Sequence, residues 1–296
     1  MQRVTSRQNP LVSRYRDVAQ GDVDDRLLLD GVHLVSEALA SGIAVREAVV
    51  SSEALDRADI TAIVEQLTRY GVEIVAASPM VMDAVSPVRS SSPIVAIAER
   101  PAHDAARIYA SGAPTPIQYV ASGPATAHPE LVEGRALGAG GRTVPLVIIA
   151  ADVQDPGNVG AIVRVAEAGG ASAVVMAGHS ADPFGWKALR GSMGSALRLP
   201  IVVRERAGQA VDEARQHGCR IVATVPRNGQ SLFSVDLTVG VAVLVGGEGA
   251  GIEQRLTDEA DVRVTIPMRP PVESLNTAVT AALIVYEARR QQGAVL

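Results

Sequence analysis

The sequence has little cysteine, few aromatic residues and no long apolar run. Its single cysteine, Cys219, excludes an intrachain disulfide and a cysteine-rich zinc site, and a small buried role is expected for it. Aromatic residues are only 3% of the 296 residues, so the core must consist mainly of Val, Ile, Leu and Ala. No apolar run reaches the roughly 18 residues of a membrane helix, and the first residues lack the apolar stretch of a secretory signal. We therefore expect a cytoplasmic protein without a membrane span.

Positive charge is in deficit over the whole chain but gathered at its start. The formal net charge of −5 by itself disfavours a nucleic-acid partner. Local patches rather than whole-chain charge do the binding, however. The first sixteen residues contain no acid and four arginines, which are candidate nucleic-acid contacts: Arg3, Arg7, Arg14 and Arg16. The five histidines form no cluster with metal-ligand spacing, so no metal is expected.

The length suits two domains, and the pattern of residues 1–100 indicates a small α/β domain. A helix is predicted over 27–42 from apolar residues at helical spacing, and another over 59–71. Short β-branched runs predict strands at 46–51, 72–78 and 93–99. Residues 101–143 are rich in Ala, Gly, Pro, Ser and Thr, so we interpret them as a linker or insertion with one short strand near Ile117.

From Val144 to the end, apolar strands alternate regularly with helices. Strands that are apolar throughout indicate a parallel sheet covered by helices on both faces. Ligands of such α/β sheets bind at the carboxyl ends of the strands. The loops that follow the strands are therefore where functional residues are expected.

Three of these loops carry candidate chemistry. In 152–170, Pro156 and Gly157 make a turn, Asn158 can cap the following helix, and Arg164 lies on that helix. Alone, this pattern is more typical of a capped surface helix with an Arg164–Glu167 ion pair.

The other two loops are rich in glycine and in proline. Residues 244–252, LVGGEGAGI, allow close backbone approach to a ligand, although a simple glycine-rich turn has the same pattern. The glycine spacing matches neither a dinucleotide fingerprint nor a phosphate loop. In 265–283, prolines stiffen the chain before the last helix, which Ser274 can cap with Asn276 in its first turn.

Taken together, the segments DPGNVGAIVRVAEAGGA, LVGGEGAGI and IPMRPPVESLNTAV resemble the three motifs of the SpoU/TrmH family of RNA ribose methyltransferases, in the SPOUT superfamily. KALRGSMGSALRLPI is similar to the family's Arg-x-Ser-x-Gly stretch, and SRQNPLV and LLLDGVHLVSEAL resemble its N-terminal RNA-binding domain. The chain departs from the family pattern at three positions: Gly247 replaces a common Asn, Asp30 a usual Glu, and Thr280 a usual Ala.

The resemblance implies an RNA substrate-binding domain at 1–100, a linker or insertion at 101–143 and a methyltransferase domain at 144–296. The latter would contain a deep trefoil knot with S-adenosyl-L-methionine bent in the knotted loops. Backbone at Gly246, Ile266 and Leu275 would hold this cofactor, and Glu248 and Met268 would line its pocket. Glycine at 246 fits this role, because main-chain groups must reach the ligand without a side chain in the way.

The resemblance also implies the catalytic residues and the partners. Arg164 is assigned to the ribose 2′-hydroxyl nucleophile, with Asn158, Ser274 and Asn276 in support. An arginine is a poor base because its pKa exceeds about 12, so we favour Arg164 binding the target phosphate and stabilising the developing alkoxide. Ribosomal RNA is expected in preference to transfer RNA, and a homodimer is expected. An apolar stripe of the last helix could serve either the dimer or the core: Ala278, Ala281, Ala282 and Val285.

Three alternatives compete with this interpretation. A hydrolase is disfavoured because Arg190 occupies the first glycine position of the elbow-like stretch Gly191–Gly194. A nicotinamide enzyme fails on its glycine spacing. A non-catalytic RNA-binding paralogue of the same fold would have lost Arg164 or the loop around Glu248, whereas this chain keeps both.

Overall fold

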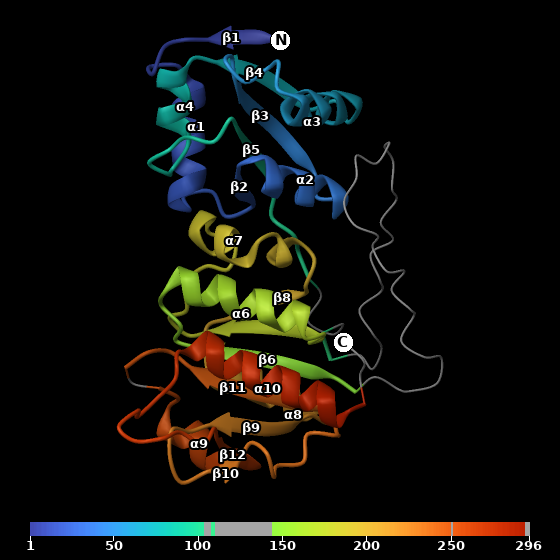
Figure 1. The fold of residues 1–296 in the computed structure, drawn as a ribbon, viewed down its shortest axis with the longest axis vertical. Coiled ribbons are helices and arrows are strands. Elements are labelled where there is room, and N and C mark those ends of the chain that lie inside the picture. The colour runs from blue at the N-terminus through green and yellow to red at the C-terminus, as the bar shows by residue number, and fades with distance from the viewer. Residues whose placement is uncertain (104–107, 110–143, 250, 294–296) are drawn as a thin grey trace. The chain divides into compact units, whose positions relative to one another are not determined.

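The structure of the protein is a computed structural model, and it describes residues 1–103, 108–109, 144–249 and 251–293. The described residues form two compact units (Figure 1). The first unit draws on Met1–Ala102, Val159–Arg164 and Ala181–Arg198, and the second on His103–Asn158, Val165–Ser180 and Leu199–Leu296. Most of 101–143, with the strand expected near Ile117, lies outside the described residues. The predicted domain boundaries therefore stay a prediction.

A five-stranded sheet organises the first unit, in the order β1-β4-β3-β5-β2. The strands are β1 (Gln2–Val4), β2 (Arg26–Asp30), β3 (Val45–Ser51), β4 (Glu73–Ala77) and β5 (Ile94–Glu99). β1, β4 and β3 run parallel, whereas β5 is antiparallel to both of its neighbours. The three strands predicted from β-branched runs are thus confirmed as β3, β4 and β5.

The helices of the first unit are α1 (Pro10–Gln20), α2 (Val32–Ala40), α3 (Ala58–Arg69), α4 (Pro79–Val85) and α7 (Trp186–Ser192), with a short 3-10 helix at Ser195–Leu197. The helix predicted over 27–42 is wrong in its first part, because Leu27–Leu29 pair with β5 as part of β2. The chain turns at Gly31, where φ is 103°, a value that side-chain-bearing residues rarely adopt. α2 then begins at Val32.

The second unit is built on a seven-stranded sheet in the order β10-β12-β9-β11-β6-β7-β8. Each strand of this sheet runs parallel to its neighbours. The strands are β6 (Leu146–Ala151), β7 (Ala173–Ala177), β8 (Ile201–Arg204), β9 (Arg220–Thr224), β10 (Gln230–Ser231), β11 (Val241–Gly246) and β12 (Val262–Thr265). All residues of β6 and β7 are buried, as expected for strands covered on both faces.

The remaining helices are α6 (Pro156–Ala168), α8 (Ala207–Gln216), α9 (Gln254–Glu259) and α10 (Thr277–Gln291). α8 contributes Ala210, Val211 and Ala214 to the cluster that covers one face of β6, and α10 packs on β11 and β6. The predicted α/β fold with a parallel sheet is confirmed, and the trefoil knot stays a prediction. No helix in the described part of the chain is long and apolar enough to cross a bilayer.

A short stretch of the predicted linker belongs to the core of the second unit. Ile108 and Tyr109 are buried there, and the Tyr109 ring stacks on His217 with centroids 4.7 Å apart. Cys219 is buried in the same cluster, and burial raises the pKa of its thiol to about 11. The thiol therefore stays protonated near neutral pH, which fits the expected small buried role.

Two helix caps differ from those expected from the sequence. α6 is capped by Asp155, whose Oδ1 accepts from the backbone N–H of Asn158 at 2.8 Å, so Asn158 already lies in the first turn. Pro156 opens the helix, which is where proline is best tolerated. α10 is capped by Asn276 rather than Ser274, with the Asn276 Oδ1 accepting from the N–H groups of Ala278 and Val279.

We expect Asp155→Ala to lower the stability of the fold by about 1 kcal/mol, because it leaves an N–H group of the first turn of α6 without its side-chain acceptor. Asp155→Asn should retain most of the stability, since its amide oxygen can accept the same hydrogen bond. The midpoint of urea unfolding measures both. Equal midpoints for the Ala variant and the wild type would show that this cap contributes nothing.

Candidate functional site

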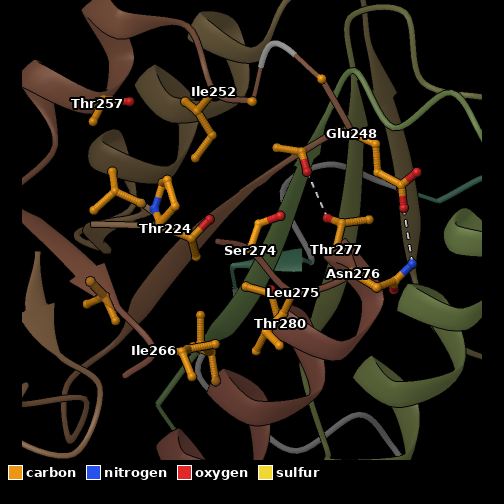
Figure 2. Close-up of a pocket in the computed structure, with 18 of the residues that line it drawn as sticks. Thr224, Glu248, Ile252, Thr257, Ile266, Ser274, Leu275, Asn276, Thr277 and Thr280 are labelled. Atoms are coloured by element: carbon orange, nitrogen blue, oxygen red, sulfur yellow. Dashed lines mark hydrogen bonds between the residues drawn. The ribbon is translucent and has the colours of Figure 1, made fainter. Parts of the chain in front are cut away.

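A cavity of about 720 Å³ lies at the carboxyl ends of β9, β11 and β12 (Figure 2). Its walls come from the segment after β9, the glycine-rich segment after β11, the segment after β12 and the first turns of α10. The residues that line it are Thr224, Val225, Pro226, Gly246, Gly247, Glu248, Gly249, Gly251, Ile252, Gln254, Thr257, Val264, Ile266, Met268, Ser274, Leu275, Asn276, Thr277, Thr280 and Ile284. This is the position at which ligands of parallel α/β sheets bind.

The glycine-rich segment folds tightly on itself under this cavity. A Cβ atom at Gly246 would lie 2.6 Å from the carbonyl carbon of Gly251, and one at Gly247 would lie 1.9 Å from the carbonyl oxygen of Asp152. Any side chain at either position would therefore force the backbone to move. Gly247 also pairs with Gly251 in an isolated antiparallel bridge. The departure from the family's common Asn at 247 thus accompanies a backbone path open only to glycine.

One side chain ties this segment to α10. The Thr277 Oγ1 donates to the carbonyl oxygen of Gly246 at 2.8 Å, and Thr277 is buried (Figure 2). Gly246 is the last residue of β11, and Thr277 is the first of α10. The hydrogen bond therefore joins two walls of the cavity at the point where the backbone leaves the sheet.

A second junction joins three loops at one carboxylate. The Glu248 Oε1 accepts from the Nδ2 of Asn158 at 3.0 Å and from the Nδ2 of Asn276 at 3.1 Å. The Asn276 Nδ2 also donates to the Asn158 Oδ1 at 2.9 Å, so its two hydrogens serve two acceptors. An ionised carboxylate can only accept, and this fixes both amides with their nitrogens toward Glu248. Figure 2 shows the Asn276–Glu248 bond at the edge of the cavity.

The structure brings most of the predicted site residues together. All the predicted cofactor residues line the cavity, namely Gly246, Glu248, Ile266, Met268 and Leu275. Two of the predicted catalytic residues, Ser274 and Asn276, line it as well. Asn158 does not line it but contacts two residues that do. Arg164 is not among the lining residues, and its exposed side chain makes no hydrogen bond or ion pair with another described residue. Arg164 follows Asn158 by six residues on α6, so at about 3.6 residues per turn the two side chains point about 120° apart around the helix axis.

Sequence reasoning missed the wall that follows β9. Thr224 ends that strand, and Val225 and Pro226 continue the lining. The loop carries no motif, and only the rule that ligands sit at strand ends pointed to it. Thr257 of α9 was missed too, because its burial depends on how α9 packs.

The four arginines proposed for RNA contact are exposed, but three of them have partners in the first unit. The Arg14 Nη2 forms an ion pair with Glu47 at 2.5 Å. The Nε atoms of Arg7 and Arg16 donate to the carbonyl oxygens of Met80 and Ala84 at 3.2 and 3.1 Å. Arg3, on β1, has no partner among the described residues. Part of this positive charge therefore serves the fold.

The apolar stripe of α10 suggested for a dimer lies mostly in the core. Ala278, Ala281 and Val285 are buried within the chain and belong to the core, whereas Ala282 is half-buried. A different face of α10 is exposed, formed by Val279, Leu283 and Tyr286. Leu283 and Tyr286 line a shallow apolar hollow of about 590 Å³ with Phe233, which is 70% exposed.

No group of three or more His, Cys, Asp or Glu residues within the described ranges is placed to hold a metal ion. The expected absence of a metal stays a prediction.

Comparison with known proteins identifies relatives over the whole chain. A protein described as an uncharacterised tRNA/rRNA methyltransferase of Synechocystis sp. is 30% identical over 294 residues, which cover 98% of this chain and 94% of that protein. The 23S rRNA (guanosine(2553)-2'-O)-methyltransferase RlmP of Bacillus subtilis is 29% identical over 262 residues, 88% of each chain. The crystal structure of the SpoU methyltransferase AviRb from Streptomyces viridochromogenes, in complex with the cofactor AdoMet, superposes with a TM-score of 0.77 at 26% identity. The alignment covers 96% of this chain and 98% of AviRb.

The sequence model of the SpoU rRNA methylase family matches residues 145–286. This range holds all the lining residues of the cavity and the junction of Asn158, Glu248 and Asn276. With a relative that matches along nearly its whole length, the chain belongs to the SpoU rRNA methylase family.

Proposed function

We propose that this protein transfers a methyl group from S-adenosyl-L-methionine to a ribose 2′-hydroxyl of ribosomal RNA. The observation that carries the proposal is the cavity at the strand ends, whose walls are the three loops that resemble the family motifs. Relatives named for 23S rRNA 2′-O-methylation support both the reaction and the choice of ribosomal over transfer RNA. A cytoplasmic location, as expected from the sequence, is part of the same proposal.

The residues present fit this cofactor. Gly246 and Gly247 line the cavity with main chain alone, which can face a ligand's polar edge. Ile252, Ile266 and Leu275 supply apolar surface suited to a flat adenine ring. Glu248 supplies a carboxylate to the lining, which complements the positive sulfonium and ammonium groups of the cofactor.

When bound, S-adenosyl-L-methionine supplies an activated methyl group on a good leaving group. The ribose 2′-oxygen forms a bond to the methyl carbon as the carbon–sulfur bond breaks, leaving 2′-O-methylribose and S-adenosylhomocysteine. The hydroxyl proton must leave in this step, and we assign it to the RNA phosphate or to water. Positioning should supply much of the rate, because reacting atoms held in line avoid the entropic cost of an encounter.

In this proposal, Arg164 binds the target phosphate and stabilises the developing alkoxide. Its exposure and its lack of a partner among the described residues support the role, because the guanidinium is free to make a bidentate phosphate contact. Asn158, Ser274 and Asn276 position the nucleophile. The amides of Asn158 and Asn276 are already oriented by Glu248, so this part of the site is ordered before RNA binds.

We further propose that the protein forms a homodimer and that its domains have separate functions. The exposed apolar face of Val279, Leu283 and Tyr286, with Phe233 beside it, suits contact with a second copy because it would be costly to leave in water. Residues 1–100 would recognise RNA, 101–143 would link, and 144–296 would carry out methyl transfer.

Thr277→Val is expected to weaken S-adenosylhomocysteine binding by roughly five-fold, about 1 kcal/mol, because it removes the hydrogen bond that holds the Gly246 carbonyl. Thr277→Ser should bind like the wild type, since it keeps the hydroxyl. Calorimetric titration without RNA measures both. Wild-type affinity in the Val variant would show that the cavity does not depend on this bond, whereas no binding by the wild-type protein would favour a non-catalytic RNA-binding paralogue.

Arg164→Ala should slow methyl transfer to ribosomal RNA by about 100-fold or more, because it removes the group proposed to stabilise transition-state charge. S-adenosylhomocysteine affinity should change less than about two-fold, as Arg164 does not line the cavity. The two values come from single-turnover kinetics and from calorimetry. Near-normal turnover in the variant would refute the assignment.

Leu283→Glu should convert a dimer in solution to a monomer, because it places a charge in the exposed apolar face of α10. Val203→Glu is the control, since Val203 is also an exposed branched aliphatic residue but lies on β8. Light scattering coupled to size-exclusion chromatography gives the mass of each. A monomeric wild-type protein, or a dimeric Leu283 variant, would contradict the proposed interface.

A further inference from the structure

A buried carboxylate lies at the end of β2 in the first unit, and it is not among the residues that line the cavity. The side chain of Asp30 is 0% exposed. It accepts hydrogen bonds from the Ser86 Oγ at 2.7 Å and from the Ser92 Oγ, and the Nη1 of Arg190 lies 3.6 Å from its Oδ1. Burying a carboxylate is costly unless it is paired and hydrogen-bonded, and these three groups offset that cost.

The two serines stand at the two ends of one surface loop, residues 86–92, which connects α4 to β5 (Figure 1). Ser86 follows the last residue of α4, and Ser92 precedes β5 by two residues. Both ends of the loop are thus bound to the same carboxylate, and Pro87 and Pro93 restrict the backbone beside each pinned serine. The loop is therefore held in place before any partner arrives.

The middle of this loop presents positive charge and hydroxyl groups to solvent. Arg89 and Ser90 are exposed, and Arg89 makes no hydrogen bond or ion pair with another described residue. The exposed Arg16 lies next to the start of the loop, where its Nε donates to the carbonyl oxygen of Ala84. That bond leaves the two terminal nitrogens of Arg16 available. Asp83 on α4, which is also exposed, is the acidic residue nearest to this loop in the sequence.

We propose that residues 86–92 form an RNA-contacting loop in which Arg89 and Arg16 bind phosphates of the substrate. The inference rests on the proposed function and identifies where in the first unit the RNA backbone is held. A guanidinium on a pre-organised loop loses little conformational entropy on binding, and its planar donors match a phosphate. Serine hydroxyls beside it are common partners of phosphate oxygens. Asp30 acts as a positioning residue, since it contacts the loop and not the RNA.

The test is the affinity for a 23S rRNA transcript, measured by filter binding at several salt concentrations. Arg89→Ala should raise Kd about 3- to 10-fold and reduce the slope of log K against log salt by about 1, the effect of one lost phosphate contact. The matched control is Arg69→Ala, which removes the same charge from an exposed site at the end of α3. Equal effects at Arg89 and Arg69, or none at Arg89, would overturn the proposal.

Ser92→Ala tests the positioning role separately, because it removes one of the two pins and leaves every arginine in place. It should weaken RNA binding in the same direction, and its effect should be less than additive with that of Arg89→Ala. Additive effects, or unchanged RNA affinity in Ser92→Ala, would overturn the role of Asp30. Each variant is also titrated with S-adenosylhomocysteine, whose affinity should equal that of the wild type. A wild-type protein that binds no S-adenosylhomocysteine would instead contradict the proposed function.

Discussion

The order of the site depends on one carboxylate that accepts two amide hydrogen bonds. Glu248 lies in the loop after β11, Asn158 in the first turn of α6, and Asn276 at the cap of α10. The three segments are far apart in sequence, and their side chains meet here, where the Asn276 Nδ2 also donates to the Asn158 Oδ1. Because a carboxylate cannot donate, neither amide can flip without losing its bond. The bond between Glu248 and Asn276 thereby joins two segments that line the cavity, and the bond from Thr277 to Gly246 joins them a second time.

Much of this site could be predicted because its residues lie in sequence motifs, whereas the rest depends on packing. Runs of apolar residues identified the strands of the parallel sheet. The glycines at 246 and 247 marked a close backbone approach, and a Cβ atom at either position would lie within 3 Å of neighbouring backbone atoms. Thr224 and Thr257 carry no local signal, since only the neighbouring strand order brings them to the cavity. The caps were misplaced by up to three residues because several Asx and Ser residues compete near each helix start. Leu27–Leu29 suited a helix and a strand equally well, and pairing with β5 decided between them.

The arginines proposed to contact RNA are likewise difficult to identify from the sequence alone. Counting charge identified a basic segment at the start of the chain, but Arg14 is paired with Glu47, and Arg7 and Arg16 each use one donor on a backbone carbonyl. Arg89 stands in a stretch with no excess of charge, and it is the structure that shows its loop pinned at both ends to a buried carboxylate. Arg89 stands on an ordered loop and has no partner among the described residues, so it is the better candidate for a phosphate contact. Arg16 adds the two terminal nitrogens that its backbone bond leaves available.

The most direct test of the central claim is to locate the transferred methyl group. The protein is incubated with ribosomal RNA and methyl-labelled S-adenosyl-L-methionine, and the RNA is hydrolysed in alkali, which cannot cleave next to a 2′-O-methylated ribose. The account predicts label in alkali-resistant dinucleotides, and its loss when Arg164 is replaced by Ala. Label in ordinary mononucleotides, which places the methyl group on a base, or no transfer at all with a protein that binds the cofactor, would contradict it.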